Sequence, residues 1–427
     1  MPPGGRCVFF PSRDRSLSPV DQGRERHARR RAISAPSVAI VHDYLTQRGG
    51  AERVVLSMAR AFPEAPVYTS LYSPETTYPE FADVDVRPLW LQRLRPLRRH
   101  HRLAFPLLPL AFGADRLDYD VVLCSSSGWA HGVRTRGVKI VYCHSPARWL
   151  YLRNTHIAED RPWHALALRA ARVPLVAWDQ RAAASATSYV VNSENVQRRV
   201  HEVYGTRAEV LHPPVRFPAE GPTTPVPVGG RFYLCVARLL RYKNVHQVVQ
   251  AFEHLPNLEL VVVGDGPEGD VLQRTAGPNV HLVGSVGDSE LRWLYRNCAG
   301  LVSASYEDFG LTPVEAAIFG KPSVVLASGG YLETVVPGRT GIYFGAAEAG
   351  QIADAVRRAE RQTWVPERII EHATIFQEPY FMARLRALVA AQVGEVPAAA
   401  RPRAEAGWVA APSPDEPTPV VSPSWSR

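Results

Sequence analysis

The sequence lacks the features that mark membrane-spanning proteins, disulfide-rich proteins and zinc-cluster proteins. No apolar run reaches the roughly 18 to 20 residues that a helix needs to cross a bilayer. Only five cysteines occur in 427 residues, and they include no C-x-x-C pair. Scattered cysteines beside apolar runs favour buried thiols over disulfides or a metal cluster. These absences predict a cytoplasmic protein with reduced cysteines.

A strongly basic folded surface is also lacking, although the net charge is +8. Residues 1–35 hold eight arginines against three acidic residues, which accounts for five of the eight positive charges. The remainder is weakly basic, so we expect no nucleic-acid partner. Residues 1–35 have neither sustained periodicity nor the apolar stretch of a secretory signal, which predicts a disordered basic arm or a start codon assigned too early. Residues 394–427 hold seven prolines and predict a disordered tail.

Strand and helix patterns alternate between these two ends, which predicts parallel sheets flanked by helices. Apolar runs with the length of buried strands occur at 37–42, 121–125, 138–143, 188–192, 232–237, 258–264, 280–283, 300–305 and 323–327. Residues 213–231 are rich in proline and glycine, as is typical of a domain linker. We therefore expect an α/β protein with two doubly wound, Rossmann-like domains, residues 36–212 and 232–365, that face a ligand cleft.

Two glutamates frame a glycine-bearing turn in the second domain, within the stretch EDFGLTPVE. Glu307 is expected in the loop at the carboxyl end of a strand and Glu315 in the first turn of a helix, so both carboxylates can face one crevice. Three backbone N–H groups at the positive end of this helix suit a phosphate, those of Phe309, Gly310 and Leu311. The spacing alone is also met by unrelated loop and helix acids, because glutamate pairs eight positions apart are common.

The residues around these glutamates resemble the signature of retaining glycosyltransferases of family 4. The pattern is E-x-F-G-L-x-x-x-E, followed by Gly-Lys-Pro and Ser-Gly-Gly. The resemblance implies the GT-B fold, a contact from Glu307 to the hydroxyls of a donor sugar, and a contact from Glu315 to the ribose of its nucleotide. It also implies that the helical segment 366–393 returns to the first domain. Asp308 departs from the pattern, because a glycine is usual at that place.

Two cations follow the first strand of the second domain. Arg238 offers a fork of donors and Lys243 a point charge, a combination suited to the diphosphate of a leaving group. Each charge-assisted contact is worth roughly 1.5 to 3 kcal/mol. A solvated basic loop is the alternative explanation. The resemblance implies a catalytic part for both residues in stabilising the departing diphosphate.

A G-x-G-x-x-G sequence at residues 264–269 follows an apolar strand and matches a dinucleotide-binding fingerprint. It stands in the middle of the second domain, whereas a dinucleotide-binding half carries it after its first strand. The same residues resemble the Gly-x-Gly-Pro turn of family 4, which implies backbone contacts from Gly264 and Gly266 to the donor nucleotide. A purely structural tight turn is the alternative.

The first domain offers candidates for the opposite wall of the cleft. Gly49 and Gly50 allow close backbone approach to a phosphate or an acceptor, or they form a flexible connecting loop. The elements HDYL and GGAE around them, and YCHSPARWLY at 142–151, resemble a branch of family 4 that includes bacterial mannosyltransferases of surface-polysaccharide assembly. The resemblance implies that His144 reaches the donor sugar, although a histidine after a buried strand is often structural. Asp43 is a candidate on the acceptor side.

Residues 89–112 mix arginines with tryptophan and leucine, a composition that suits an anionic membrane surface. Pro96 argues against one long straight helix, so a solvated face with a buried stem is the alternative. The membrane hypothesis predicts that Arg98→Glu and Arg99→Glu abolish binding to anionic liposomes.

These features together predict a retaining hexosyltransferase. It would move a hexose, mannose by the branch that it resembles, from GDP-mannose or a UDP-sugar to a glycan or polyprenyl-linked acceptor. We expect no permanently bound cofactor and no metal, because the two D-x-D sequences flank strands of the first domain. A sugar-nucleotide epimerase, a glucan phosphorylase and a non-catalytic nucleotide-sugar-binding subunit stay open. The expected location is the cytoplasm, with peripheral attachment at the inner face of the plasma membrane as an open question.

Overall fold

The computed structural model describes residues 36–94, 107–114, 116–151, 162–215 and 217–393. The predicted basic arm and proline-rich tail lie outside the described residues. So do Arg98 and Arg99, the two residues on which the membrane hypothesis depends.

The first domain is built on a seven-stranded parallel sheet with the order β3-β2-β1-β5-β7-β8-β9. Its strands are β1 (Val38–His42), β2 (Val67–Thr69), β3 (Val86–Pro88), β5 (Val121–Ser126), β7 (Val138–Cys143), β8 (Ser188–Val191) and β9 (Ala208–Val210). The central strands β1 and β5 are buried along their whole length, as expected of apolar strands that are covered on both faces. Register pairs Val38 with Val121 and His42 with Ser125, so the two strands end side by side.

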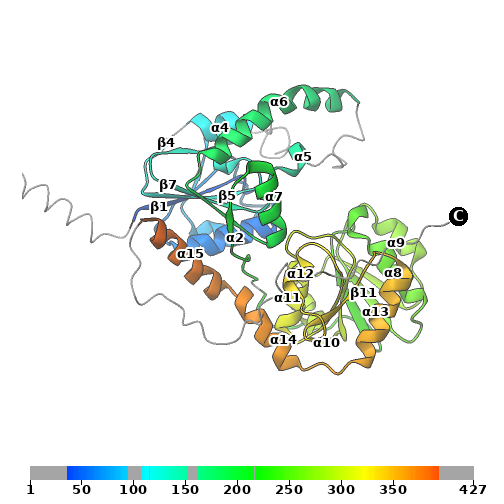
Figure 1. Ribbon diagram of the computed structural model, residues 1–427. Helices are drawn as coiled ribbons and strands as arrows, with labels where there is room; N and C mark the ends of the chain where they lie inside the picture. The colour runs from blue at the N-terminus through cyan, green and yellow to red at the C-terminus, as the bar shows by residue number, and fades with distance from the viewer. Residues whose placement is uncertain (1–35, 95–106, 115, 152–161, 216, 394–427) are drawn as a thin grey trace, which may run out of the picture.

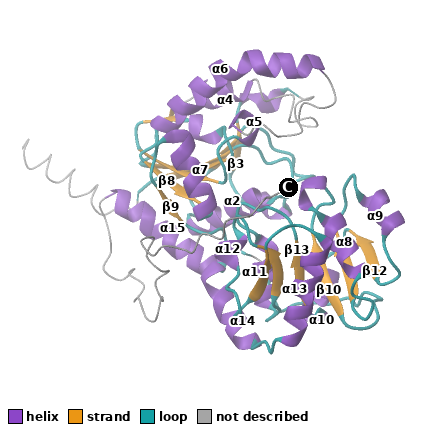
Figure 2. Cartoon of the chain, turned by 45° about the vertical axis from the view of Figure 1, so that its right-hand side comes forward, coloured by secondary structure: helices purple, strands orange, loops and turns teal. Residues whose placement is uncertain are grey.

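Helices cover both faces of this sheet (Figure 2). They are α2 (Gly50–Ala61), α4 (Leu108–Ala114), α5 (Arg148–Tyr151), α6 (Pro162–Ala184) and α7 (Glu194–Tyr204), with short 3₁₀ turns η1 (Pro79–Asp83), η2 (Trp90–Arg93) and η4 (Ala130–Gly132). A small two-stranded sheet pairs β4 (Arg116–Leu117) with β6 (Arg134–Thr135).

The second domain repeats the plan with six parallel strands in the order β12-β11-β10-β13-β14-β15. The strands are β10 (Phe232–Val236), β11 (Glu259–Val263), β12 (Val280–Gly284), β13 (Gly300–Ser303), β14 (Ser323–Leu326) and β15 (Gly341–Phe344). The helical elements are η6 (Arg241–Lys243), α8 (Val245–Glu253), α9 (Gly269–Thr275), α10 (Asp288–Asn297), α11 (Leu311–Ile318), α12 (Tyr331–Thr334) and α13 (Ala349–Arg361). The predicted fold class of two doubly wound α/β domains is confirmed.

Both sheets reverse their strand order at one place, and this decides where a ligand can bind. In the first domain the chain winds outward from β1 to β3 and then restarts beside β1 with β5. In the second domain it winds from β10 to β12 and restarts beside β10 with β13. The carboxyl ends of the strands at such a switch point are splayed by their diverging connections and leave a crevice.

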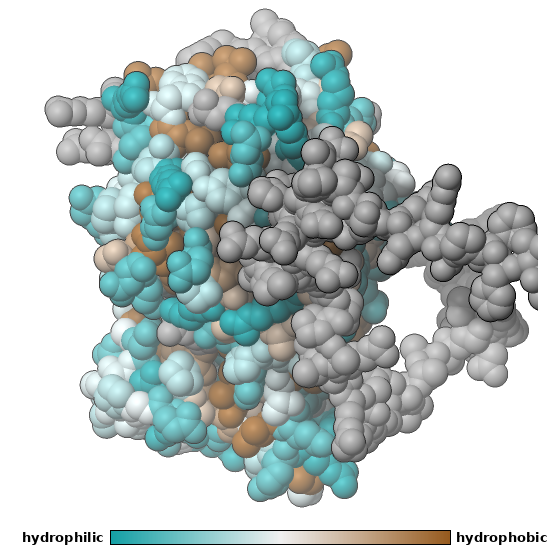
Figure 3. All heavy atoms as spheres, turned by 90° about the vertical axis from the view of Figure 1, so that its left-hand side faces the viewer, coloured by the Kyte–Doolittle hydropathy of each residue, from teal (hydrophilic) through white to brown (hydrophobic). Residues whose placement is uncertain are grey.

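The last helices cross back from the second domain to the first (Figure 1). Helix α14 (Pro366–Ala373) and the turn η7 (Thr374–Phe376) pack with α11, and helix α15 (Glu378–Val393) packs on α2. Phe381, Leu385 and Val389, four positions apart, form one stripe of α15 inside the core of the first domain. On the part of the surface seen in Figure 3, apolar residues are scattered among polar ones, as on ordinary protein surfaces.

Candidate active site

A cleft of about 1020 Å³ lies between the domains, at the carboxyl ends of the strands that flank both switch points. Twelve of the thirteen predicted site residues line it: Asp43, Gly49, Gly50, His144, Arg238, Lys243, Gly264, Glu307, Phe309, Gly310, Leu311 and Glu315. Gly266 is not among the lining residues. The structure therefore gathers residues that stand up to 272 positions apart in the sequence.

Glu307 and Lys243 form an ion pair at the switch point of the second domain. Glu307 follows β13 and Lys243 ends the turn η6 after β10. The hydroxyl of Ser305 donates a second hydrogen bond to the same carboxylate oxygen, Oε1, at 2.7 Å. Two donors on one oxygen orient the carboxylate and leave Oε2 for a further partner such as a sugar hydroxyl.

Arg238 lies on the same loop as Lys243, and its side chain is exposed to the cleft. Within the described residues the guanidinium has no hydrogen-bond or ion-pair partner. An unpaired guanidinium beside the paired Lys243 provides donors that an anion can take up without breaking an existing contact. The arrangement suits a diphosphate.

Glu315 is the fifth residue of α11 rather than part of its first turn as predicted, because the helix begins at Leu311, and its side chain is 9% exposed. The phenol of Tyr295 donates a hydrogen bond to its Oε2 at 2.8 Å. Burial raises the pKa of Glu315, while the hydrogen bond from Tyr295 and the charge of Arg53 act in the opposite direction. Arg53 comes from α2 of the first domain and also lines the cleft. It is a site residue that the sequence reasoning passed over, although it follows the GGAE element directly.

The start of α11 explains three further predicted residues. Gly310 has φ 90° and ψ 75°, and a Cβ there would lie 2.5 Å from a ring carbon of Tyr331. Phe309 turns its side chain into the protein, 5.3 Å from the ring of His212 and 5.6 Å from that of Phe376, so only its backbone serves the cleft. Leu311 approaches Gly50 of the opposite domain, where an added Cβ would lie 3.4 Å from Leu311 Cδ1.

The first two glycines of the G-x-G-x-x-G sequence are required by packing against the protein's own backbone. A Cβ at Gly264 would lie 2.0 Å from the carbonyl oxygen of Ala237, and one at Gly266 would lie 2.4 Å from that of Leu239. The sequence follows β11, the second strand of its domain, rather than the first. These contacts favour the tight-turn alternative, and only Gly264 borders the cleft.

Asp43 uses its carboxylate inside the first domain. It accepts hydrogen bonds from the backbone N–H groups of Ser127 at 2.6 Å, Trp129 at 3.2 Å and Ala130 at 2.6 Å. With 3% of its surface exposed, it holds the loop after β5 in place. Gly49 precedes α2 as its N-cap, and Gly50 is the first residue of that helix.

His144 ends a chain of buried polar groups. His42 Nδ1 lies 3.0 Å from both the carbonyl oxygen and the hydroxyl of Ser125, and this hydroxyl lies 2.8 Å from His144 Nε2. Because the carbonyl can only accept, His42 carries its proton on Nδ1, which leaves the hydrogen of the Ser125 hydroxyl available for donation to His144. Burial, followed by the charge of His42, lowers the pKa of His144 to about 3. The imidazole is therefore neutral, and donation from Ser125 to Nε2 would place its proton on Nδ1.

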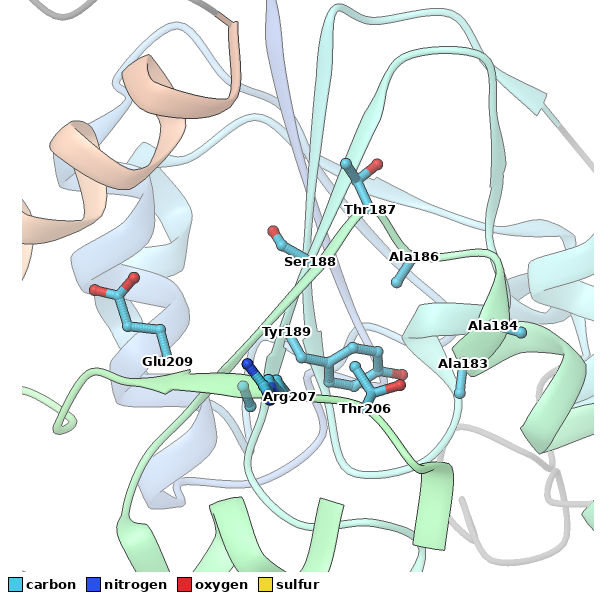
Figure 4. Close-up of a pocket in the computed structure, with 10 residues that line it drawn as sticks. Ala183, Ala184, Ala186, Thr187, Ser188, Tyr189, Thr206, Arg207 and Glu209 are labelled. Atoms are coloured by element: carbon cyan, nitrogen blue, oxygen red, sulfur yellow. The ribbon is translucent and has the colours of Figure 1, made fainter. Parts of the chain in front are cut away.

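A smaller cavity of about 420 Å³ lies at the opposite end of the first sheet (Figure 4). It is lined by small side chains at the end of α6 and at the amino ends of β8 and β9, with the exposed Arg207 and Glu209 as its charged groups. Among the described residues, Tyr189, which is 3% exposed, is the only buried polar side chain that lines it. Within the described residues, no three His, Cys, Asp or Glu side chains gather closely enough to hold a metal ion.

Two family models match the chain, one over most of each domain. The model of Glycosyltransferase Family 4 matches residues 48–216, and the model of Glycosyl transferases group 1 matches residues 220–375. The alpha-1,3/1,6-mannosyltransferase ALG2 of Homo sapiens is 26% identical over 372 residues, which cover 75% of this chain and 86% of the human protein. The D-inositol 3-phosphate glycosyltransferase of Mycobacterium tuberculosis strain F11 is 31% identical over 202 residues, 42% of each chain.

Solved structures share the fold. Anabaena Alr3699/HepE in complex with UDP-glucose superposes with a TM-score of 0.60 at 19% identity, covering 83% of this chain and 100% of the other. The sucrose-phosphate synthase of Thermosynechococcus elongatus gives a TM-score of 0.59 at 18% identity, covering 84% and 100%. At these identities the likeness concerns the architecture alone.

Proposed function

Because this chain is a GT-B glycosyltransferase, with the first domain described by Glycosyltransferase Family 4 and the second by Glycosyl transferases group 1, we propose that it transfers a hexose from a nucleotide diphosphate sugar. The observation that carries the proposal is the oriented Glu307–Lys243 pair beside the unpaired Arg238, in a cleft that Glu315 and His144 also line.

Each group has one part in this proposal. Arg238 and Lys243 neutralise the diphosphate as it leaves, an effect that grows with the developing charge. Glu315 holds the ribose, and the free oxygen of Glu307 accepts from a hydroxyl of the hexose. Neutral His144 donates its Nδ1 proton to the same sugar. Retention of configuration rests on the family resemblance, in which the leaving phosphate assists the acceptor on the same face.

The identity of the hexose rests on relatives. The human relative is named as a mannosyltransferase, and the Anabaena structure contains UDP-glucose, so GDP-mannose and UDP-sugars are the donors to compare. We propose mannose and a glycan or polyprenyl-linked acceptor at the inner face of the plasma membrane. In the part of the chain that the structure describes, every helix is too short or too polar to cross a bilayer.

The donor site is tested by thermal unfolding with GDP, UDP, ADP and NAD, and with the sugar forms of the first three. A ligand at about 100 times its dissociation constant stabilises the fold by about 2.7 kcal/mol. We expect GDP or UDP species to raise the melting temperature and Lys243→Ala to remove the shift. Arg241→Ala is the matched control, because Arg241 belongs to the same turn and is exposed, but does not line the cleft.

Two results would count against the proposal. A shift with NAD alone would assign the cleft to a dinucleotide. Full transfer activity in both Glu307→Ala and Lys243→Ala would show that the reaction does not use this pair. A free epimerised sugar nucleotide formed without acceptor would instead identify an epimerase.

A further inference from the structure

Asp308, next to the sugar-binding candidate Glu307, makes its contacts with the other domain. Its carboxylate forms an ion pair with Arg148 of α5 through Oδ2, and accepts from Arg199 of α7 through Oδ1 at 3.1 Å. The side chains of Asp308 and Arg199 are only 10% and 14% exposed. An ion pair at this depth is screened by salt less than one on the surface.

Arg199 joins this contact to the opposite wall of the cleft. The same nitrogen, Nη1, donates to Asp308 and, at 2.8 Å, to the hydroxyl of Ser145. Ser145 directly follows His144 in the sequence. The residue after Glu307 and the residue after His144 are therefore held by one guanidinium, although the two site residues belong to different domains.

Helix α7 takes part in two more contacts of this kind. The phenol of Tyr306, two positions before Asp308, donates to Asn195 Oδ1 at 2.8 Å. Glu333 of α12 accepts from the backbone N–H groups of Glu194 at 2.8 Å and Asn195 at 3.3 Å. Residues of the second domain therefore contact α7 at its first turn and at Arg199. Two of these residues, Tyr306 and Asp308, lie in loop 304–310.

Loop 304–310 is anchored in both domains. Glu307 pairs with Lys243 inside the second domain, while Asp308 pairs with the first. Consecutive Cα atoms are about 3.8 Å apart, so an anchor on Asp308 limits how far Glu307 can move. Domains joined by a linker move relative to one another unless contacts favour one arrangement, and these contacts favour the arrangement of this structure.

We propose that Asp308 is a positioning residue whose ion pairs with Arg199 and Arg148 hold loop 304–310 against the first domain, so that Glu307 and His144 contact the same hexose. This inference rests on the proposed function, because it takes the ligand between the two residues to be the hexose of a nucleotide sugar. The nucleotide contacts lie on the second domain and do not depend on the ion pairs.

The test uses calorimetry to compare the dissociation constant of a nucleoside diphosphate with that of its sugar form. The ligand pair is GDP and GDP-mannose, or UDP and UDP-glucose, according to which pair stabilises the protein. In Asp308→Asn the dissociation constant of the diphosphate stays within twofold of the wild type. The constant of the sugar form rises about tenfold, the equivalent of one charged hydrogen bond. Arg199→Gln gives the same change, and the double variant adds little, because both substitutions remove the Arg199–Asp308 ion pair.

Glu209→Gln is the matched control, because it breaks an exposed ion pair with Arg384 away from the cleft, and should leave both constants unchanged. A general loss of folding would weaken the binding of both ligands equally and leave the ratio of their dissociation constants as in the wild type. If Asp308→Asn does not fold, the ratio of the two dissociation constants is measured in Arg148→Gln instead, because the side chain of Arg148 is 48% exposed.

A second measurement follows the domains directly. Spin labels at Glu202→Cys on α7 and Asp270→Cys on α9, both exposed positions, report the distance between the domains, with Cys7 replaced by serine and the buried cysteines unlabelled. We expect Asp308→Asn to lengthen and broaden the distance distribution. An unchanged distribution together with an unchanged ratio of constants would overturn the inference. A wild-type protein that binds no nucleotide would overturn the proposed function instead.

Discussion

Gly310 shows how one residue sets the geometry of the donor loop. Its φ of 90° is rarely adopted by other residues, and a Cβ would lie 2.5 Å from the ring of Tyr331, whose hydroxyl pairs with Ser303 and Ser305. We expect Gly310→Ala to lower the free energy of unfolding by more than the about 1 to 2 kcal/mol that backbone strain costs alone. Denaturant unfolding of Gly338→Ala separates the two effects, because Gly338 has φ 75° and no atom within 4 Å of an added Cβ. Equal losses of unfolding free energy in Gly310→Ala and Gly338→Ala would show that the ring of Tyr331 moves aside without a measurable energetic cost.

His144 is expected to stay neutral across the physiological range. Its pKa is lowered to about 3 by burial, whereas the unfolded chain takes up the proton near the usual value of 6.5. Its contribution to stability is therefore complete above pH 6.5 and is lost progressively as the pH falls toward 3. NMR spectra of the histidine rings, assigned with His144→Gln, should show no protonation of His144 between pH 8 and 5. A protonation midpoint near pH 6 would mean that water solvates the imidazole ring of His144.

The position of a site residue was predictable from sequence where that residue belongs to a strand–loop–helix pattern that the sequence shows. Glu307 and Lys243 lie in loops after strands that apolar runs reveal, and Glu315 lies in the helix that follows the loop of Glu307, so their common cleft could be foreseen. The partners of Asp308 stand 109 and 160 positions away, on two helices of the other domain. The aspartate in place of glycine was visible, but no local pattern indicated what it contacts.

At the scale of elements, Glu333 of α12 links the protein's stability to pH through α7. Burial raises its pKa to about 7, although the two N–H groups of α7 favour the ionised form. The unfolded chain releases this proton near the usual value of 4.5, so between pH 4.5 and 7 it binds fewer protons than the folded protein. Stability therefore falls as the pH rises through this range, and Glu333→Gln should reduce the fall.

Melting temperatures from pH 4.5 to 8 measure this effect. Glu202→Gln, on the exposed side of α7, changes the net charge equally without touching α12 and should keep the wild-type slope. An identical slope in Glu333→Gln and the wild type would show that Glu333 ionises in the folded protein as it does in the unfolded chain.

The sequence revealed the longer buried strands but not the shortest ones. The buried central strands coincide with the predicted runs to within two residues, because a continuous apolar run of five or six residues is a strong pattern. Four strands of the two large sheets were missed: β2, β3 and β9 have three residues each and β15 (Gly341–Phe344) has four, and β3, β9 and β15 lie at sheet edges. Such short segments leave no periodicity to detect.

The whole molecule depends on the returning helix α15, because the first domain is incomplete without it. Leu385 is 1% exposed and lies among residues of β1, α2 and β7 in the core of that domain. We expect Leu385→Ala to destabilise the first domain by about 2 to 5 kcal/mol, through lost burial and the cavity that remains. Because Leu385 is remote from the nucleotide contacts, the thermal shift caused by the nucleotide diphosphate should persist in this variant. Gln392→Ala, on an exposed position of the same helix, should stay within about 0.5 kcal/mol of the wild type in chemical unfolding. Equal stability of the two variants would mean that α15 rests on the first domain without completing its core.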